Sequence, residues 1–311
     1  MIEILKTFDD GIRQINEIEQ GCWIVMTSPS ATELLEISER CNVDIDHLRA
    51  PLDEEERSRI EVEDNYTLIL VDIPTMEERN NKDRYVTIPL AIIVAKEVII
   101  TICLEETKVL KSFMDGRVRN FYTHKKTRLI LQILYKNASV FLQYLRIIDR
   151  KSEEIEHKLH ISTKNSELME ILELEKSLVY FTTSLRSNEV VLEKMLKIDN
   201  IKQYPEDTEL LEDVIIENKQ AIEMSNIYSG ILSSTREAFA SVISNNLNIV
   251  MKFLAAVTIV MAIPTMIASF FGMNVGGIPG KNDLYGFFFV TGGAFVIAII
   301  IALIFRKKDL F

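Results

Sequence analysis

Two long apolar segments, residues 249–271 and 287–305, lie close together near the end of this 311-residue chain. The first contains a single charge, Lys252, and the second contains none. Each is near the roughly 20 residues that a helix needs to cross about 30 Å of hydrocarbon. Because only a short Gly-rich stretch joins them, the pattern predicts a hairpin of two membrane-spanning helices in a lipid bilayer.

The basic residues around these segments indicate how they cross the membrane. Arg306, Lys307 and Lys308 directly follow the second segment, Lys252 stands near the start of the first, and the connecting loop contains only Lys281. Positive charge accumulates on the cytoplasmic side of membrane proteins. We therefore expect a multi-pass protein of the cytoplasmic (inner) membrane, with its N- and C-terminal ends in the cytoplasm.

The rest of the chain has the composition of a water-soluble body. The net charge is -11, and roughly the first 245 residues are enough for one or two domains. This acidic balance argues against nucleic acid as a partner and is compatible with cations. The cysteines, Cys22, Cys41 and Cys103, are scattered and lack the spacing of metal ligands, so they are expected to be reduced thiols.

The sequence contains no pattern typical of an enzyme. The histidines at positions 47, 124, 157 and 160 form neither a metal-binding motif nor a catalytic triad pattern. The soluble part also lacks a Gly-rich loop of the kind that holds phosphate groups. We therefore expect a protein without enzymatic activity and without an organic cofactor.

The soluble body divides into two regions that differ in their sequence patterns. Residues 1–118 mix short apolar segments with helical patterns, which predicts a cytoplasmic α/β domain. Residues 119–204 carry Leu and Ile at helical spacing, with neither Gly nor Pro from position 120 onward, which predicts long antiparallel helices. Strands are expected at 22–27, 58–63, 67–73, 86–95 and 98–103, helices of the first domain at 31–40 and 44–49, and a break between the long helices at 162–165.

A single helix is expected to run from the soluble body into the membrane. Pro205 opens it, and Glu206 and Asp207 follow in its first turn, where the helix dipole favours acids. Gly230 is the only glycine before the membrane, and no proline occurs before Pro264. The fold class is therefore an α+β membrane protein with a long helical stalk over 205–271, on the order of 100 Å long. An extracytoplasmic loop at 272–286, a second membrane helix at 287–305 and a basic cytoplasmic tail at 306–311 complete it.

One face of the stalk helix is mostly small or polar along its whole length, and we call it the polar stripe. Lipid would leave its polar groups unsatisfied, so the membrane part must face water or another helix. A small-residue packing face is the simpler alternative, but acids in the soluble part pack poorly. A pore built from two spans per chain needs several copies around an axis, and a step of 3.5 residues suits a left-handed bundle. In the membrane the stripe comprises Asn248, Met251, Ala255, Thr258, Ala262, Thr265 and Ser269. In the soluble part it comprises Ser244, Ser241, Glu237, Ser234, Gly230, Ile227, Glu223, Gln220, Ile216 and Asp213.

The tripeptide Gly272-Met273-Asn274, which closes the first of two C-terminal membrane segments, resembles the signature of the CorA family of divalent-cation transport proteins. The likeness extends over the whole predicted architecture. It implies a homopentamer with a funnel-shaped cytoplasmic part, whose first span lines the pore. By the same resemblance, Asn274 supplies a ring of amide oxygens that holds a hydrated Mg²⁺ at the external mouth, while Gly272 and Met273 shape the turn.

Further residues take roles by the resemblance to this family. Asn248 matches a pore-lining asparagine, Met251 and Leu254 match a hydrophobic constriction, and Thr265 matches a pore threonine. Glu237 and Asp213 match stalk positions of regulatory metal sites between subunits. The partner acids for these sites are expected among Glu77, Glu78 and Asp83. Mg²⁺ would then be both the transported and the regulatory ion, with Co²⁺ as a further cargo.

The loop after the motif departs from the pattern of many magnesium-transporting members. Residues 275–283 contain one acid, Asp283, which Lys281 offsets, so the attraction of cations to the mouth should be weaker. Phe271 also stands where many members have Tyr. The Gly-Gly-Ile-Pro loop is similar to one in the ZntB branch, so a proton-coupled Zn²⁺ transporter is the first alternative. A non-conducting metal sensor or scaffold on a membrane anchor is the alternative of another class.

Overall fold

The computed structural model describes residues 1–9, 11–79, 82–118, 120–161, 165–198, 205–273 and 285–308. Its contacts divide the chain into two compact units, Met1–Arg236 and Glu237–Phe311, and the boundary falls inside one helix. Residues 274–284 of the loop predicted at 272–286 and residues 309–311 of the tail predicted at 306–311 lie outside the described residues. Arg306 and Lys307 belong instead to the last turn of a helix.

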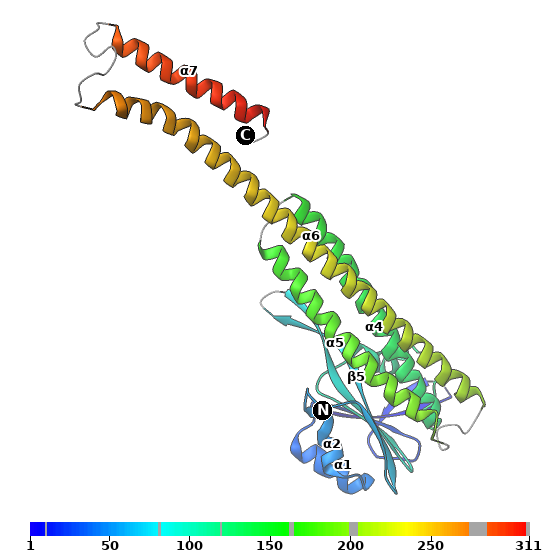
Figure 1. Cartoon of the computed structure of the whole chain (residues 1–311). Helices are drawn as coiled ribbons and strands as arrows, with labels where there is room; N and C mark the ends of the chain where they lie inside the picture. Colours follow the sequence, from blue (N-terminus) through cyan, green and yellow to red (C-terminus); the bar gives the residue numbers. More distant parts are fainter. Residues whose placement is uncertain are drawn as a thin grey trace. The chain divides into compact units, whose positions relative to one another are not determined.

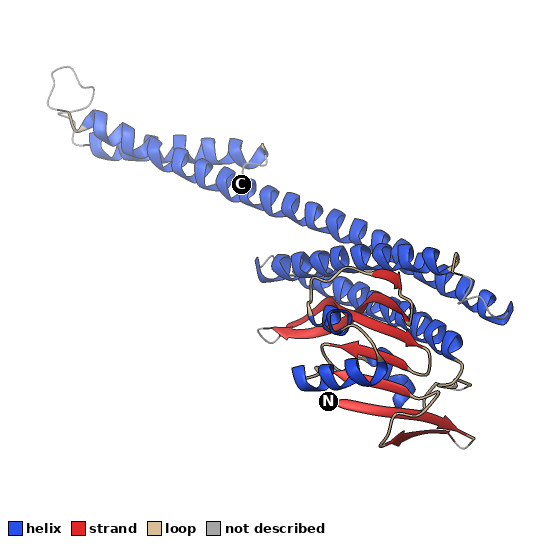
Figure 2. Cartoon of the chain, turned by 90° about the horizontal axis from the view of Figure 1, so that it is seen from below, coloured by secondary structure: helices blue, strands red, loops and turns tan. Residues whose placement is uncertain are grey.

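The first unit is built on one seven-stranded sheet with the order β2-β1-β3-β7-β6-β5-β4 (Figure 2). β3 and β7 pair in parallel, and all other neighbours are antiparallel. The strands predicted at 86–95 and 98–103 are present and pair as an antiparallel hairpin, since Ile93 lies opposite Ile100. The strands are β1 (Ile2–Phe8), β2 (Gly11–Ile15), β3 (Trp23–Thr27), β4 (Arg59–Val62), β5 (Tyr66–Arg79), β6 (Lys82–Ala95) and β7 (Ile99–Cys103).

Helices cover both faces of this sheet. On one face, α1 (Ala31–Cys41) and α2 (Ile45–Arg49) place Leu34, Ile37 and Leu48 in a core with the side chains of β3, β5, β6 and β7. On the other face, the ring of Phe113 on α3 (Lys108–Met114) meets that of Trp23 edge to face at 6.3 Å. Because both faces of the sheet are covered, the side chains of β3 and β7 are buried on either side, and these strands are mostly apolar in sequence.

Three long helices complete the first unit: α4 (Lys126–Ile161), α5 (Asn165–Met195) and the soluble part of α6 (Pro205–Phe271). Figures 1 and 2 show them side by side, with α4 and α5 against the sheet. Polar contacts fasten α6 to α5, because the buried hydroxyl of Ser225 lies 2.7 Å from that of Thr182 and the Asn218 amide donates to the Leu185 carbonyl at 3.0 Å. The predicted long helices are therefore present. Of the break predicted at 162–165, residues 162–164 lie outside the described residues, and Asn165 begins α5.

Five elements differ from the sequence-based expectation. The strands β1 and β2 and the helix α3 were not predicted. The predicted strands at 67–73 and 86–95 were too short, because β5 and β6 continue as a 14-residue pair up to Arg79 and Lys82. β5 continues through Pro74, which pairs with Thr87, because pairing with a long neighbouring strand outweighs the low strand propensity of proline.

Candidate functional site

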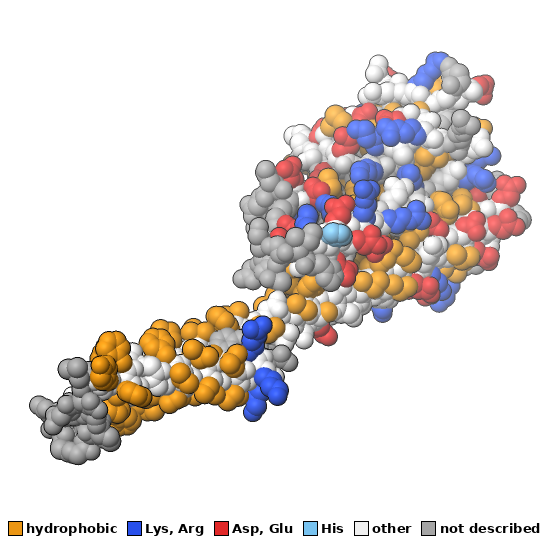
Figure 3. All heavy atoms as spheres, turned by 90° about the horizontal axis from the view of Figure 1, so that it is seen from above, with side chains coloured by type: hydrophobic (Ala, Val, Ile, Leu, Met, Phe, Trp, Pro, Cys, Tyr) orange, Lys and Arg blue, Asp and Glu red, His pale blue; other side chains and the backbone are white. Residues whose placement is uncertain are grey.

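Among the described residues, two helices are long and apolar enough to cross a membrane: α6 from Glu206 to Phe271 and α7 (Gly286–Lys307). Their most apolar windows have mean hydropathies of 2.1 and 2.8, and only 6% and 11% of those windows are buried. A core helix of a soluble protein would be mostly buried, so this pattern fits segments that lipid or other subunits cover. Figure 3 shows hydrophobic side chains spread over the surface of this part of the chain.

Within the second unit, one face of α6 is covered and the rest is exposed. The covered face contains the buried Ala256 together with partly buried Val257, Val260, Ile263, Pro264 and Ile267. On α7, Ala294 and Ala298 are buried. Small residues let membrane helices approach closely, so these alanines form the packing face between the two spans. Sequence reasoning missed this face, for which the small size of the three alanines was the available signal.

The polar stripe in the membrane lies elsewhere on the helix. All of its residues are exposed, as is Leu254 beside it, and Met251 and Leu254 are each 57% exposed. Thr258 and Thr265 donate their hydroxyls to the carbonyls of Leu254 and Met261, four residues earlier, at 2.8 and 3.0 Å. A shallow groove of about 500 Å³ runs along the stripe. It is lined by Thr258, Met261, Ala262, Thr265, Met266, Ser269 and Phe270.

The stripe is also the exposed face of α6 in the soluble body. Every position from Asp213 to Ser244 assigned to it is exposed, including the acids Glu223 and Glu237. The opposite face packs into the first unit through buried residues such as Leu211, Val214 and Ala221. A side chain added at Gly230 would meet nothing within 4 Å in this chain. The stripe is therefore not a packing face within one subunit.

The predicted selectivity motif is described only in part. The helix α6 ends at Phe271, and the Gly272 amide donates to the Ala268 carbonyl at 2.9 Å. A Cβ atom at position 272 would lie 3.3 Å from that same carbonyl oxygen, so glycine suits this helix end. Met273 donates its amide to the Phe270 carbonyl at 3.3 Å. Asn274, like Lys281 and Asp283, lies outside the described residues.

The acids predicted as regulatory partners lie near the end of the long β5–β6 hairpin. Glu78 pairs with Asp83 across the two strands, and Glu77 pairs with Arg84. The Lys151 ammonium on α4 lies 2.7 Å from the Asp83 carboxylate. Partial burial lowers the pKa of Lys151, but hydrogen bonds to Asp83 and Tyr85 outweigh it and raise that pKa above its usual value. Asp83 is thus neutralised within the subunit, whereas Glu77 and Glu78 are exposed.

Comparisons with known proteins support one family. A model described as CorA-like Mg²⁺ transporter protein matches residues 19–307. The cobalt/magnesium transport protein CorA of Methanocaldococcus jannaschii is 30% identical over 299 residues, which cover 92% of this chain and 90% of that protein. The complete structure of the CorA magnesium transporter from the same organism matches with a TM-score of 0.84 at 27% identity, covering 100% of this chain and 99% of that one.

A second branch shares the fold at lower similarity. The cytoplasmic domain of ZntB from Vibrio parahaemolyticus matches with a TM-score of 0.60 at 12% identity, covering 79% of this chain and 97% of that one. This likeness concerns the fold alone. It does not indicate which ion this chain transports.

An α/β body, a stalk helix with an exposed polar face and two apolar C-terminal helices together define a two-span membrane transport protein. More particularly, the chain belongs to the family of CorA-like Mg²⁺ transporter proteins. The family resemblance predicted from Gly272-Met273-Asn274 is confirmed.

Proposed function

We propose that this chain is one subunit of a homopentameric Mg²⁺ channel of the cytoplasmic membrane, in which α6 of each subunit lines the pore. Membership of the family assigns the chain to divalent-cation transport. The observation that carries the pore assignment is the polar stripe, which stays exposed from Asp213 to Ser269 and, in the membrane part, lies beside faces of α6 that are largely apolar. Five copies arranged around an axis would turn each polar stripe toward a central, water-filled pore and away from lipid.

Asn274 is proposed as the selectivity residue. Mg²⁺ gives up its water shell reluctantly, so a ring of amide oxygens at the mouth can select the hydrated ion through hydrogen bonds to its waters. A ring of carboxylates would hold the ion more tightly and slow its release. Met251 and Leu254 supply an apolar constriction nearer the cytoplasmic end, which can close by losing its water.

Regulation by internal Mg²⁺ is proposed to act between subunits. Glu237 and Asp213 are exposed on the stalk, and Glu77 and Glu78 are exposed on the hairpin. Ions bridging such acids would hold the subunits together in a closed state at high internal Mg²⁺. At low Mg²⁺ the unshielded carboxylates would repel one another and favour opening. Asp83 would have to exchange Lys151 for the ion.

Zn²⁺ transport is the second candidate, because the loop 275–283 has one acid and a neighbouring lysine. Such a mouth attracts cations weakly, and coupling to a proton gradient could then drive uptake. A non-conducting sensor is the third outcome that an experiment must separate.

Ion flux into proteoliposomes tests these functions. Mg²⁺ and Zn²⁺ are supplied separately, with and without a pH gradient, to the wild type, to Asn274→Ala and to the loop control Asn282→Ala. Voltage-driven Mg²⁺ entry that Asn274→Ala abolishes and Asn282→Ala retains supports the proposal. Zn²⁺ uptake that requires the pH gradient, with little Mg²⁺ flux, would replace it with the zinc function. No flux of either ion would favour the sensor.

A further inference from the structure

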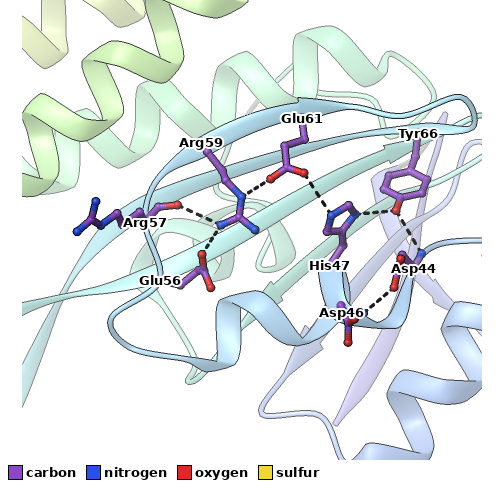
Figure 4. A network of polar contacts seen from close by, with 8 residues as sticks. All are labelled: Asp44, Asp46, His47, Glu56, Arg57, Arg59, Glu61 and Tyr66. Carbon is purple, nitrogen blue, oxygen red and sulfur yellow. Dashed lines mark hydrogen bonds and ion pairs between the residues drawn. The ribbon is translucent and has the colours of Figure 1, made fainter.

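Three potential metal ligands from separate segments meet at the β4 edge of the sheet. They are His47 on α2, Glu61 on β4 and Glu63 just after β4, and one ligand atom from each lies within 4.8 Å of the others. Figure 4 shows His47 and Glu61 pointing toward one another. The sequence pattern did not reveal this cluster, because its histidine is 14 and 16 positions away from its acids.

The imidazole of His47 is held in a defined orientation. Its Nδ1 lies 2.7 Å from the hydroxyl of Tyr66, which also accepts a hydrogen bond from the Asp44 amide at 3.3 Å (Figure 4). Burial raises the pKa of Tyr66, so the phenol stays neutral. If Nδ1–H donates to this oxygen, the lone pair of Nε2 points at the acids. A hydrogen bond of this kind orients metal-binding histidines.

Glu61 is oriented in a similar way. Its Oε1 accepts a hydrogen bond from Arg59, and its Oε2 lies 3.3 Å from Nε2 of His47. Two ligands bound tetrahedrally to one ion, each about 2.0–2.1 Å from it, are about 3.3 Å apart. The spacing of these two atoms therefore already matches that of ligands sharing one ion.

The surroundings supply negative charge and an open side. Asp44, Asp46 and Glu56 lie around the cluster, and Arg59 contacts Glu56 as well as Glu61 (Figure 4). Glu63 and Tyr66 also line a cavity of about 970 Å³. Because Glu63 is exposed, water can complete the coordination of an ion that has three protein ligands.

From this geometry we infer that His47, Glu61 and Glu63 bind a transition-metal dication such as Zn²⁺ or Co²⁺ within a single subunit. One imidazole with two carboxylates suits Zn²⁺, Co²⁺ and Ni²⁺, whereas Mg²⁺ prefers oxygen ligands alone. The site is independent of the proposed pore and of the proposed acids between subunits. A simple ion pair between protonated His47 and Glu61 is the competing explanation, and it needs no Glu63.

Titration of the full-length protein in detergent with Co²⁺, followed by its visible absorption, and with Zn²⁺, followed by calorimetry, tests the inference. His47→Asn and Glu63→Gln are each expected to weaken this binding by about tenfold or more. His157→Asn on α4 and Glu54→Gln, both exposed in the wild type, are the matched controls and should bind as the wild type does. Glu63 is itself exposed, so its amide variant should keep the fold if His47→Asn does not.

Two further measurements separate this site from transport. Asn274→Ala should retain the Co²⁺ site, and Glu63→Gln should retain Mg²⁺ flux. An equimolar amount of Mg²⁺ should leave the Co²⁺ absorption unchanged. Equal affinity of wild type and Glu63→Gln, displacement by equimolar Mg²⁺, or the absence of a Co²⁺ site in the wild type would each overturn the inference.

Discussion

Asn188 on α5 joins three parts of the first unit through a single buried side chain. Its amide oxygen accepts hydrogen bonds from the Asp72 amide at 2.8 Å and from the Ser58 hydroxyl at 3.1 Å, and its amide nitrogen donates to the Asp72 carbonyl at 2.8 Å. Asn188→Ala should cost about 1–3 kcal/mol of stability, because it leaves the Asp72 amide of β5 without this acceptor. Thermal unfolding in detergent measures the loss. The exposed Asn226→Ala serves as the control, and equal Tm values for the two variants would contradict the assignment.

Asp72 itself should make stability depend on pH. Burial raises the pKa of its carboxyl group, and hydrogen bonds with Ser184 and Ser58 offset this only in part. The folded state therefore binds this proton more tightly than the unfolded state. The contribution of Asp72 to stability is present below about pH 4 and is lost as the pH rises through the folded-state pKa.

The Tm of the wild type minus the Tm of Asp72→Asn should accordingly decrease with rising pH and then become constant. Asp64→Asn, at an exposed position, gives the control curve. A difference that grows with pH would contradict the raised pKa of Asp72.

At the scale of elements, α6 presents two adjacent alanines to different surroundings. Ala256 is 2% exposed on the face that packs within the second unit, whereas Ala255 is exposed on the polar stripe. Ala256→Leu should destabilise this unit by about 1–3 kcal/mol through overpacking. Ala255→Leu should retain the Tm of the chain yet reduce Mg²⁺ flux by narrowing the pore. The reverse outcome would mean that the stripe is a packing face.

The sequence predicted the elements with long-range periodicity well. The extent of α6 follows from the absence of helix breakers, and α4 and α5 follow from their uninterrupted helical spacing. The β1–β2 hairpin was missed because its strands are half exposed and carry charges that resemble an amphipathic helix. The length of β5 and β6 depends on their mutual pairing, which local sequence does not encode.

The candidate site was predictable to a different degree. The polar stripe is a periodic feature, so its exposed face could be read from spacing alone. The neutralisation of Asp83 by Lys151 joins residues 68 positions apart, and the His47 cluster joins α2 to β4. Such contacts arise from the fold of the chain and leave no local pattern in the sequence.

At the scale of the whole molecule, the proposed assembly predicts a definite mass. Native mass spectrometry of the detergent-solubilised protein should show five copies of the 35.7-kDa chain. A dimer would leave much of the membrane part of each polar stripe exposed to lipid, which its hydroxyl and amide groups disfavour. A predominant mass of two or four copies would contradict the pentamer.

The proposed control by internal Mg²⁺ can be tested on the stalk. Glu237→Gln, alone or with Asp213→Asn, should raise the internal Mg²⁺ concentration that half-inhibits flux by about fivefold or more, since it removes a bridging carboxylate. Glu223→Gln changes an acid of the same stripe and should leave that concentration unchanged. Equal shifts in both variants would indicate a general charge effect.

The helix α6 is the only stretch of backbone that joins the two units, because the division between them falls between Arg236 and Glu237. A continuous helix resists twisting, so we expect rotation of its soluble end to turn its membrane end as well. Pro264 is the one proline inside it and cannot donate to the carbonyl four residues earlier. The backbone hydrogen bonding of α6 is therefore weakest near Pro264, between the proposed apolar constriction and the proposed mouth of the pore. If the soluble body turns during gating, we expect α6 to bend near Pro264, beyond Met251.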